Sequence, residues 1–243
     1  MTEQVLQLRR LIQGAGRIVF FGGAGVSTES GIPDFRSAHG LYAGAQGRSY
    51  EEMLSIGFFE KHPEEFWRFY REVMLYPQAR PNPAHLALSR LEEEGKLAAV
   101  VTQNIDGLHQ TAGSRRVLEL HGSVWKNRCT RCRHPYSLEE VLPMETLPRC
   151  PRCGGILKPE VTLYGEALDD DITREAVEAI RHCDLLLVGG TSLVVYPAAG
   201  FVTLRPRSAP LVLINRDETP YDRQADLIIR ENIATVLSQA VGE

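Results

Sequence analysis

RIVFFGGAGVSTESGIPDFR, residues 17–36, is the stretch of sequence that decides the fold. Its beginning, residues 17–21, is a short run of β-branched and aromatic side chains, which is typical of a strand buried inside a parallel sheet. Gly23 and Gly25 follow this run closely and let the backbone approach a bound phosphate. The stretch therefore predicts a buried strand that ends in a turn able to cradle a nucleotide.

The second half of the stretch carries the more specific signal. A dinucleotide fingerprint needs a third glycine and a later acidic residue, but Thr28 replaces that glycine and no strand ending in Asp or Glu occurs near 43–48. The glycines alone therefore also fit an ordinary strand-to-helix turn. The continuation GIPDFR, residues 31–36, is less ordinary, because Pro33 keeps it from being helical while a carboxylate, a ring and a guanidinium follow in a row. We expect this segment to be functional.

Further motifs extend the signal over nearly the whole chain. They are TQNID at 102–106, His121-Gly122, two Cys-x-x-Cys pairs, GTS at 190–192, and Asn215. Together with 23–27 and 31–36, this set resembles the signature of the sirtuins, NAD-dependent protein lysine deacylases, in a bacterial-type form. The resemblance implies that NAD is the co-substrate and that acetyl-lysine-containing proteins are the partners.

Composition limits the class of protein. The chain has 243 residues, of which 43% are hydrophobic and 24% charged, and its formal net charge is -4. These values are typical of a globular protein with one substantial core, and they exclude a global field that would attract DNA or an anionic membrane. The beginning of the chain lacks the order of a signal peptide, and no apolar run approaches the roughly 20 residues of a membrane span. We expect a cytoplasmic protein with no membrane partner.

Apolar runs alternate with helical patterns along the chain. The runs lie at 17–21, 97–101, 184–188, 211–214 and 226–229, and the helical patterns at 2–14, 63–76, 83–94, 169–181 and 231–241. Such alternation produces a parallel sheet with helices on both faces. The fold class predicted is α/β, with a doubly wound, Rossmann-like parallel sheet.

Two segments, 38–79 and 126–157, interrupt this alternation. We expect them to form a second, smaller domain with a helical module and a zinc-ribbon module, as the resemblance implies, with a cleft between the domains. Residues 1–37, 80–125 and 158–243 would then form the NAD-binding domain. The loop 38–49 is rich in Gly and Ala, so it is either a lid over the cofactor or a plain surface connection.

Four of the five cysteines predict a structural zinc site. Cys129 and Cys132 form one Cys-x-x-Cys pair, Cys150 and Cys153 the other, and 17 residues separate the pairs, as in zinc ribbons. Four thiolates complete a tetrahedron and leave no position for a reactive water. Arginines around these cysteines also fit a nucleic-acid reader, but the aromatic stacking surface of such a protein is nearly absent, which argues against nucleic acid as a partner. We expect the fifth cysteine, Cys183, to be a small buried apolar residue and not a nucleophile.

His121 is the candidate general base. It follows the apolar run 117–120, so it lies at a strand end where its imidazole, which titrates near neutral pH, can reach a cleft. Outside the motif, a histidine there is more often structural, and the resemblance is what assigns it a catalytic role together with Asn104. His85 and His109 match no catalytic position, and we expect structural roles for them.

The resemblance also assigns the cofactor site, residue by residue. Asp106 and Ile105 correspond to nicotinamide-pocket positions, Asn215 to an adenosine-ribose position and Ile233 to a backbone contact with adenine. The whole expected set is Gly23, Ala24, Gly25, Thr28, Asp34, Phe35, Arg36, Gln103, Ile105, Asp106, Gly190, Thr191, Ser192, Asn215 and Ile233.

The protein substrate is expected to add a strand between residues 161–166 and 193–196 by main-chain pairing. Its expected contacts are Thr162, Tyr164, Gly165, Glu166, Val194 and Val195. The chain departs from the family pattern at Thr162, Tyr164, Lys158 and Glu231. The Tyr-x-x-Arg pair of the desuccinylase class is missing, because Val73 stands three residues after Tyr70. A neutral acyl group such as acetyl is therefore expected.

These observations lead to one expected function and two alternatives. We expect an NAD-dependent protein lysine deacetylase that transfers the acetyl group to ADP-ribose and releases nicotinamide. The alternatives are a mono-ADP-ribosyltransferase that uses the same intermediate, and a non-catalytic module that binds NAD and zinc. The sequence leaves the protein substrates and the oligomeric state open.

Overall fold

The computed structural model describes residues 1–34 and 48–242. Within them, the larger sheet has six parallel strands in the order β3-β2-β1-β7-β8-β9. The strands are β1 (Ile18–Gly22), β2 (Leu97–Thr102), β3 (Val117–Glu119), β7 (Leu185–Gly189), β8 (Leu211–Ile214) and β9 (Leu227–Ile229). The strand order reverses between β1 and β7, which is the switch point where doubly wound sheets bind ligands. The predicted fold class is confirmed.

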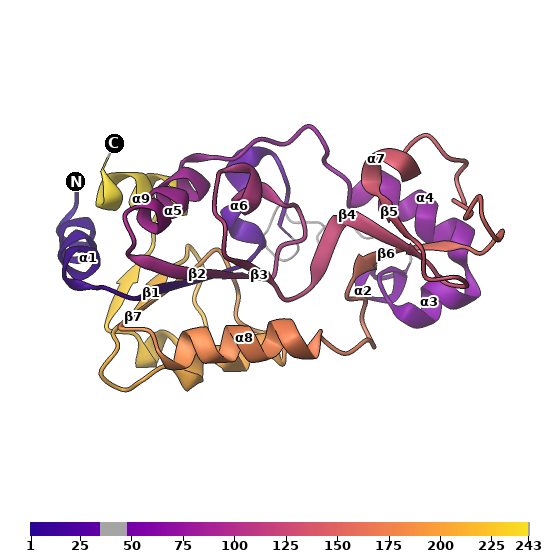
Figure 1. Cartoon of the computed structure of the whole chain (residues 1–243). Helices are drawn as coiled ribbons and strands as arrows, with labels where there is room; N and C mark the ends of the chain where they lie inside the picture. The colour runs from indigo at the N-terminus through magenta and orange to yellow at the C-terminus, as the bar shows by residue number, and fades with distance from the viewer. Residues whose placement is uncertain (35–47, 243) are drawn as a thin grey trace.

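Helices cover both faces of this sheet because its central strands are apolar on both sides. Every residue of β1 and of β7 is buried. One face packs against α1 (Glu3–Gly14), α5 (Pro83–Glu93) and α9 (Ile233–Val241), and the other against α8 (Asp170–Arg181) and the 3-10 segment η4 (Ala198–Leu204). Figure 1 shows the first group on one side of the sheet and α8 on the other. The five expected strands and helical patterns thus all appear.

A second, antiparallel sheet has the order β5-β4-β6. Its strands are β4 (Gly122–Cys129), β5 (Pro135–Ser137) and β6 (Leu157–Val161), and the short helix α7 (Leu138–Val141) follows β5. The helices α2 (Tyr50–Met53), α3 (Ile56–Lys61) and α4 (Pro63–Val73) pack against it around the buried side chains of Phe66, Trp67 and Tyr70. Trp67 ties the two parts together, because its indole Nε1 donates to the Leu157 carbonyl at 2.9 Å.

These helices (the helical module) and the small sheet with its cysteines (the zinc module) lie together at the end of the molecule opposite the two termini (Figure 1), and together they are called the small module. The expected boundaries 126 and 158 fall inside β4 and β6, so the sheet extends a few residues beyond them on each side. The division of the chain into two domains stays a prediction. The expected lid at 38–49 lies almost entirely outside the described residues.

Candidate functional site

One cleft with a volume of about 690 Å³ lies between the two sheets, at the carboxyl ends of β1, β2, β7 and β8. Twenty of the site residues expected from the sequence line it: Gly23, Ala24, Gly25, Thr28, Asp34, Gln103, Asn104, Ile105, Asp106, His121, Thr162, Tyr164, Gly165, Glu166, Gly190, Thr191, Ser192, Val195, Asn215 and Ile233. The structure therefore brings together segments that lie more than 200 residues apart in the chain. The expected residues Phe35 and Arg36 lie outside the described part.

The glycines after β1 serve a close contact between two loops. A Cβ at Gly25 would lie 2.8 Å from the Gly190 Cα, and one at Gly23 would lie 2.8 Å from the Thr191 Cβ. The backbone N–H of Gly25 donates to the Gly190 carbonyl at 2.8 Å. The sequence interpretation gave these glycines to phosphate approach or to an ordinary strand-to-helix turn, whereas the structure requires them for packing the loop after β1 (the β1 loop) onto the loop after β7 (the β7 loop).

A hydrogen-bonded chain of side chains joins the β1 loop to the β2 loop. Ser27 Oγ donates to Asp106 Oδ2 at 2.6 Å, and Asn104 Nδ2 donates to Ser27 Oγ at 3.1 Å. The other carboxylate oxygen of Asp106 accepts from the backbone N–H of Leu108 at 2.9 Å. Ser27 lines the cleft but was absent from the expected set. Its place in the motif 23–27 was the available signal.

His121 presents a neutral imidazole to the cleft. Its Nδ1 lies 3.0 Å from the Gln103 carbonyl, which can only accept, so Nδ1 carries the proton and Nε2 keeps its lone pair. Burial lowers the pKa of His121, although the bond to the Gln103 carbonyl acts in the opposite direction. The neutral form therefore dominates at pH 7, and Nε2 can accept a proton from a bound hydroxyl.

Polar side chains at the ends of β7 and β8 hold the far part of the cleft. The Asn215 Oδ1 accepts from the Thr191 N–H at 3.1 Å, and the Asn215 Nδ2 donates to the Asp217 carbonyl at 2.8 Å. Gln103 Nε2 donates to Thr191 Oγ1 at 3.0 Å, which links this region to the loop beside His121. These bonds join the loops after β2, β7 and β8 along the cleft.

Asn232 is a cleft residue that the sequence interpretation missed. Its Oδ1 caps α9 by accepting from Ala234 N and Thr235 N at 2.9 and 3.1 Å. Its Nδ2 donates to Glu29 Oε1 at 2.6 Å, which ties the start of α9 to the β1 loop. An asparagine directly before an apolar helical pattern is a recognisable N-cap signal, but it indicates a helix start and not a ligand site.

The expected protein-binding segment lies beside the small module. The Thr162 N–H donates to the His121 carbonyl at 2.9 Å, and Tyr164 pairs with the α2–α3 connection through Leu54 O and Ile56 N at 2.9 and 3.0 Å. Glu166 accepts from Lys158 Nζ at 2.9 Å. Val194 is 46% exposed and, unlike Val195, is not among the described residues that line the cleft.

An apolar wall from the helical module closes one side of the cleft. Leu54, Tyr70, Val73 and Met74 contribute to it, and only Tyr70 and Val73 figured in the sequence interpretation. Burial raises the pKa of Tyr70, so its hydroxyl stays protonated. Trp125 adds its indole, whose Nε1 donates to the Asp106 carbonyl at 2.8 Å. These residues resemble ordinary core positions in sequence, because only the tertiary arrangement places them at the cleft.

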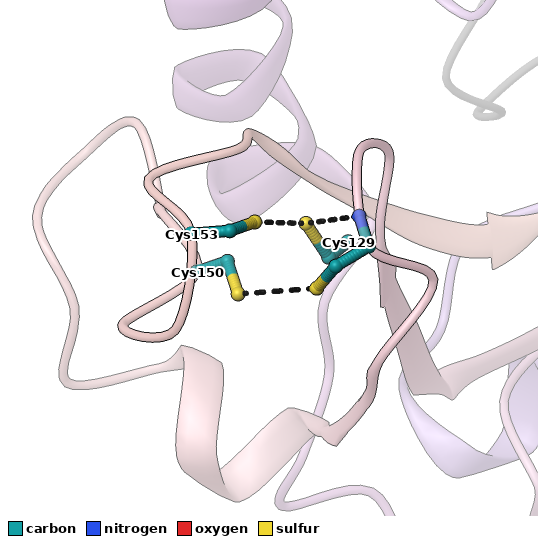
Figure 2. Close-up of side chains that lie close together, drawn as sticks. Cys129, Cys150 and Cys153 are labelled. Carbon is teal, nitrogen blue, oxygen red and sulfur yellow. Dashed lines mark hydrogen bonds between the residues drawn. The ribbon is translucent and has the colours of Figure 1, made fainter.

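The four expected zinc ligands converge on one point. Their sulfur atoms all lie within 4.8 Å of one another, with Cys129 to Cys153 at 3.5 Å and Cys132 to Cys150 at 3.7 Å. A tetrahedral Zn²⁺ with Zn–S bonds of about 2.3 Å has S···S edges of roughly 3.8 Å, whereas a disulfide needs about 2.05 Å. Figure 2 shows the two Cys-x-x-Cys turns facing each other. The donor set fits one structural zinc ion.

Comparison with known proteins supports the family expected from the motifs. The model of the Sir2 family matches residues 23–197. A Clostridium perfringens protein called NAD-dependent protein deacetylase is 51% identical over 99% of this chain and 100% of its own length. A Clostridium acetobutylicum protein of the same name is 52% identical over 99% of each chain.

Solved structures give the same result. One of a Sir2 variant with a deacetylated p53 peptide and 3′-O-acetyl ADP-ribose has a TM-score of 0.90 and 40% identity, covering 97% of this chain and 96% of its own. Another, of Sir2 with a p53 peptide and NAD⁺, has a TM-score of 0.86 and 40% identity over 96% and 95% of the two chains.

Among the described residues, no helix has the length and apolar character needed to cross a bilayer.

Proposed function

Because this chain belongs to the Sir2 family, we propose that it is an NAD-dependent protein lysine deacetylase. It transfers the acetyl group of an acetyl-lysine to ADP-ribose and releases nicotinamide. One observation carries the proposal: His121, whose Nε2 keeps its lone pair, opens onto the same cleft as the Ser27–Asn104–Asp106 network and the ends of β7 and β8. A base, a polar pocket and a dinucleotide-sized groove thus share one site.

NAD extends along this cleft with its adenosine beside Asn215 and Ile233 and its nicotinamide beside Asp106. Thr191, Ser192 and the backbone of the β1 loop hold the phosphates. The carboxylate of Asp106 accepts a hydrogen bond from the carboxamide, and Ser27 and Leu108 N–H hold that carboxylate in place. A half-buried carboxylate held in this way favours a ligand that donates to it, since a desolvated acceptor left unpaired costs free energy.

His121 moves the proton in the acetyl transfer. After the acetyl oxygen has displaced nicotinamide, Nε2 accepts the proton of a ribose hydroxyl, which then attacks the former carbonyl carbon. The Gln103 carbonyl holds the ring by its Nδ1–H and fixes which nitrogen is free. A positioned general base of this kind typically contributes about 10²- to 10⁴-fold in rate. Asn104 lies close by and orders the loop through Ser27.

Zinc supports the small module and has no part in the reaction. Four thiolates would fill its coordination sphere, so it supplies stability and not a Lewis acid for the substrate. Free thiols of this kind persist in reducing compartments, which supports the cytoplasm as the location. The apolar wall with Val73 in place of an arginine supports a neutral acyl group on the protein substrate.

The product masses test this proposal. The purified protein is incubated with NAD and peptides that carry acetyl-lysine or succinyl-lysine, and the products are identified by mass spectrometry. We expect free lysine on the acetyl peptide, an O-acetyl-ADP-ribose and nicotinamide in equal amounts. ADP-ribose attached to the peptide would instead identify a mono-ADP-ribosyltransferase, and unchanged peptide with NAD bound would identify a non-catalytic module.

A further inference from the structure

Two buried histidines lie behind the cleft and take no part in the proposed reaction. His85 is on α5 and His109 is on α6 (Leu108–Thr111), and their side chains are 0% and 1% exposed. Their ring centroids are 4.7 Å apart, with the ring planes inclined at 59°. Neither residue is among those described as lining the cleft. The sequence predicted only a structural role for each.

Most side-chain nitrogen atoms of this pair lack a hydrogen-bond partner among the described residues. His85 Nε2, both ring nitrogens of His109 and the hydroxyl of nearby Ser114 have no hydrogen-bond partner among the described residues. More than nine in ten buried polar groups in proteins are partnered, and each exception costs roughly 1–3 kcal/mol. Leucine or phenylalanine would fill the same space without that cost. The pair is therefore not explained as simple core packing.

Both rings are neutral. Burial lowers the pKa of His85 to about 4, although the Asp106 carboxylate acts in the opposite direction, and burial lowers the pKa of His109 well below its usual range. His85 Nδ1 accepts from the Asn82 N–H at 3.3 Å, so its proton is on Nε2. That donor is available to the neighbouring ring, or to a water molecule bridging the two.

Each histidine is linked through one neighbouring residue to a loop of the cofactor site. Asn82, whose backbone binds His85, donates through its side chain to the Val26 carbonyl at 2.8 Å and to Ser30 Oγ at 3.0 Å. This holds the β1 loop. On the other side, α6 begins at Leu108, whose N–H binds the Asp106 carboxylate at 2.9 Å. The hydrogen bond from Ser27 Oγ to Asp106 Oδ2 joins these two sets of contacts.

We propose that His85 and His109 form a neutral imidazole pair that fixes α6, and with it Asp106, against the β1 loop. They are positioning residues for the nicotinamide end of the cleft. The pair keeps Asp106 Oδ2 within reach of Ser27, so the carboxylate is already oriented when the carboxamide arrives. This inference rests on the assignment of Asp106 to nicotinamide in the proposed function. The far end of the cleft, at Asn215, should not depend on the pair.

The experiment compares two ligands that differ in their use of this region. Nicotinamide inhibition of deacetylation reports on the Asp106 end, while binding of ADP-ribose reports on the rest of the groove. For His109→Leu we expect the inhibition constant for nicotinamide to rise at least fivefold, with the dissociation constant for ADP-ribose within twofold of wild type. His109→Gln, which keeps a polar side chain, should restore most of the nicotinamide affinity.

Controls separate positioning from a loss of stability. Leu91→Ala creates a cavity beside the same helix, six residues from His85, and should lower the thermal midpoint with both ligand constants unchanged. If His109→Leu fails to fold, the milder His85→Gln provides the same two measurements. The inference is wrong if the foldable variant changes both ligands equally or neither. If Asp106→Asn leaves nicotinamide inhibition unchanged, the assignment of Asp106 in the proposed function is what fails.

Discussion

At the scale of single residues, His121 provides the most direct test of the proposed chemistry. We expect His121→Ala to reduce NAD-dependent turnover of an acetyl-lysine peptide by at least about a hundredfold, because it removes the general base. The thermal midpoint should change little, since within residues 1–34 and 48–242 the side chain has one hydrogen bond, to the Gln103 carbonyl. His182→Ala is a matched control, as that histidine is 60% exposed on the far side of the sheet. Turnover within threefold of wild type would contradict the assignment.

The protonation of His121 predicts a pH profile. The base works only when neutral, so kcat/KM should be level at neutral pH and should fall as the pH drops through the pKa. Burial lowers the pKa of His121, so the fall should be centred below the ordinary value of about 6.5 for histidine. Measuring kcat/KM from pH 5 to 8 checks this. A midpoint above 7 would mean that burial does not control the base.

Sequence analysis succeeded at residues whose motif fixes their neighbours and failed at those placed by tertiary structure. Asp106, Asn104 and His121 were expected at one site because each belongs to a short motif, and all three line the cleft, while their roles stay predictions. Trp125 and Asn232 were missed. The first reads as an ordinary strand residue and the second as a helix cap, and only folding brings both to the cleft.

At the scale of elements, the contact between the β1 and β7 loops depends on Gly25. In Gly25→Ala the new Cβ would lie 2.8 Å from the Gly190 Cα, so the loops must separate. We expect the KM for NAD to rise at least tenfold and the free energy of unfolding to fall by about 1–3 kcal/mol. Gly57→Ala in α3 is the control, because nothing lies within 4 Å of its Cβ position. It should be neutral or slightly stabilising. Equal behaviour of the two variants would refute the packing argument.

The zinc module should depend on all four thiolates. Cys129→Ala leaves three ligands, so we expect loss of bound zinc and a lower yield of folded protein, because metal binding contributes to folding. Cys183→Ala is the control: this buried thiol lies against α8 and outside the cluster, so zinc content should stay at one ion per chain. Metal analysis and thermal unfolding measure both effects. A stable, zinc-free Cys129→Ala protein would contradict a structural role for the metal.

The expected elements were local enough for sequence patterns to define them, and their ends were not. The apolar run 211–214 coincides with β8, whereas α4 ends at Val73, three residues before the expected end at 76. The small sheet was predicted only through its cysteines. Its strand β4 begins at Gly122, inside the segment assigned to the larger domain, because pairing with β6 continues to Val161. Long-range pairing of this kind leaves no periodic signal in the chain.

At the scale of the whole molecule, the two sheets lie on either side of the cleft and are stabilised in different ways. The larger sheet is stabilised by apolar cores on both faces, so its loop ends are held on a rigid base. The small module is stabilised by aromatic packing around Trp67 and by the zinc cluster. Ser27, Asn104 and Asp106 reach the cleft from loops of the first, and the apolar wall of Leu54, Tyr70, Val73 and Met74 comes from the second. The hydrogen-bonded network and the apolar wall of the cleft therefore come from separate parts of the chain.

The buried histidine pair makes the stability of the whole molecule depend on pH. His85 has a pKa of about 4 when folded, against about 6.5 in an unfolded chain. Between these values the unfolded state binds more protons, so the free energy of unfolding falls as the pH drops from 6.5 towards 4. Below 4 this contribution levels off. From pH 7 to pH 5, His85 alone should remove about 2 kcal/mol, and His109 acts with the same sign.

Urea unfolding at pH 7 and pH 5 measures this effect. Other groups also titrate: burial raises the pKa of Glu119, which acts in the opposite direction, so the comparison is made between wild type and His85→Gln. The variant lacks one titrating group, and its loss of stability between the two pH values should be smaller by about 2 kcal/mol. An equal loss in both proteins would show that the His85 side chain is protonated in the folded state or is exposed to solvent there. In that case the pair could not hold α6 in the neutral form on which the positioning of Asp106 depends.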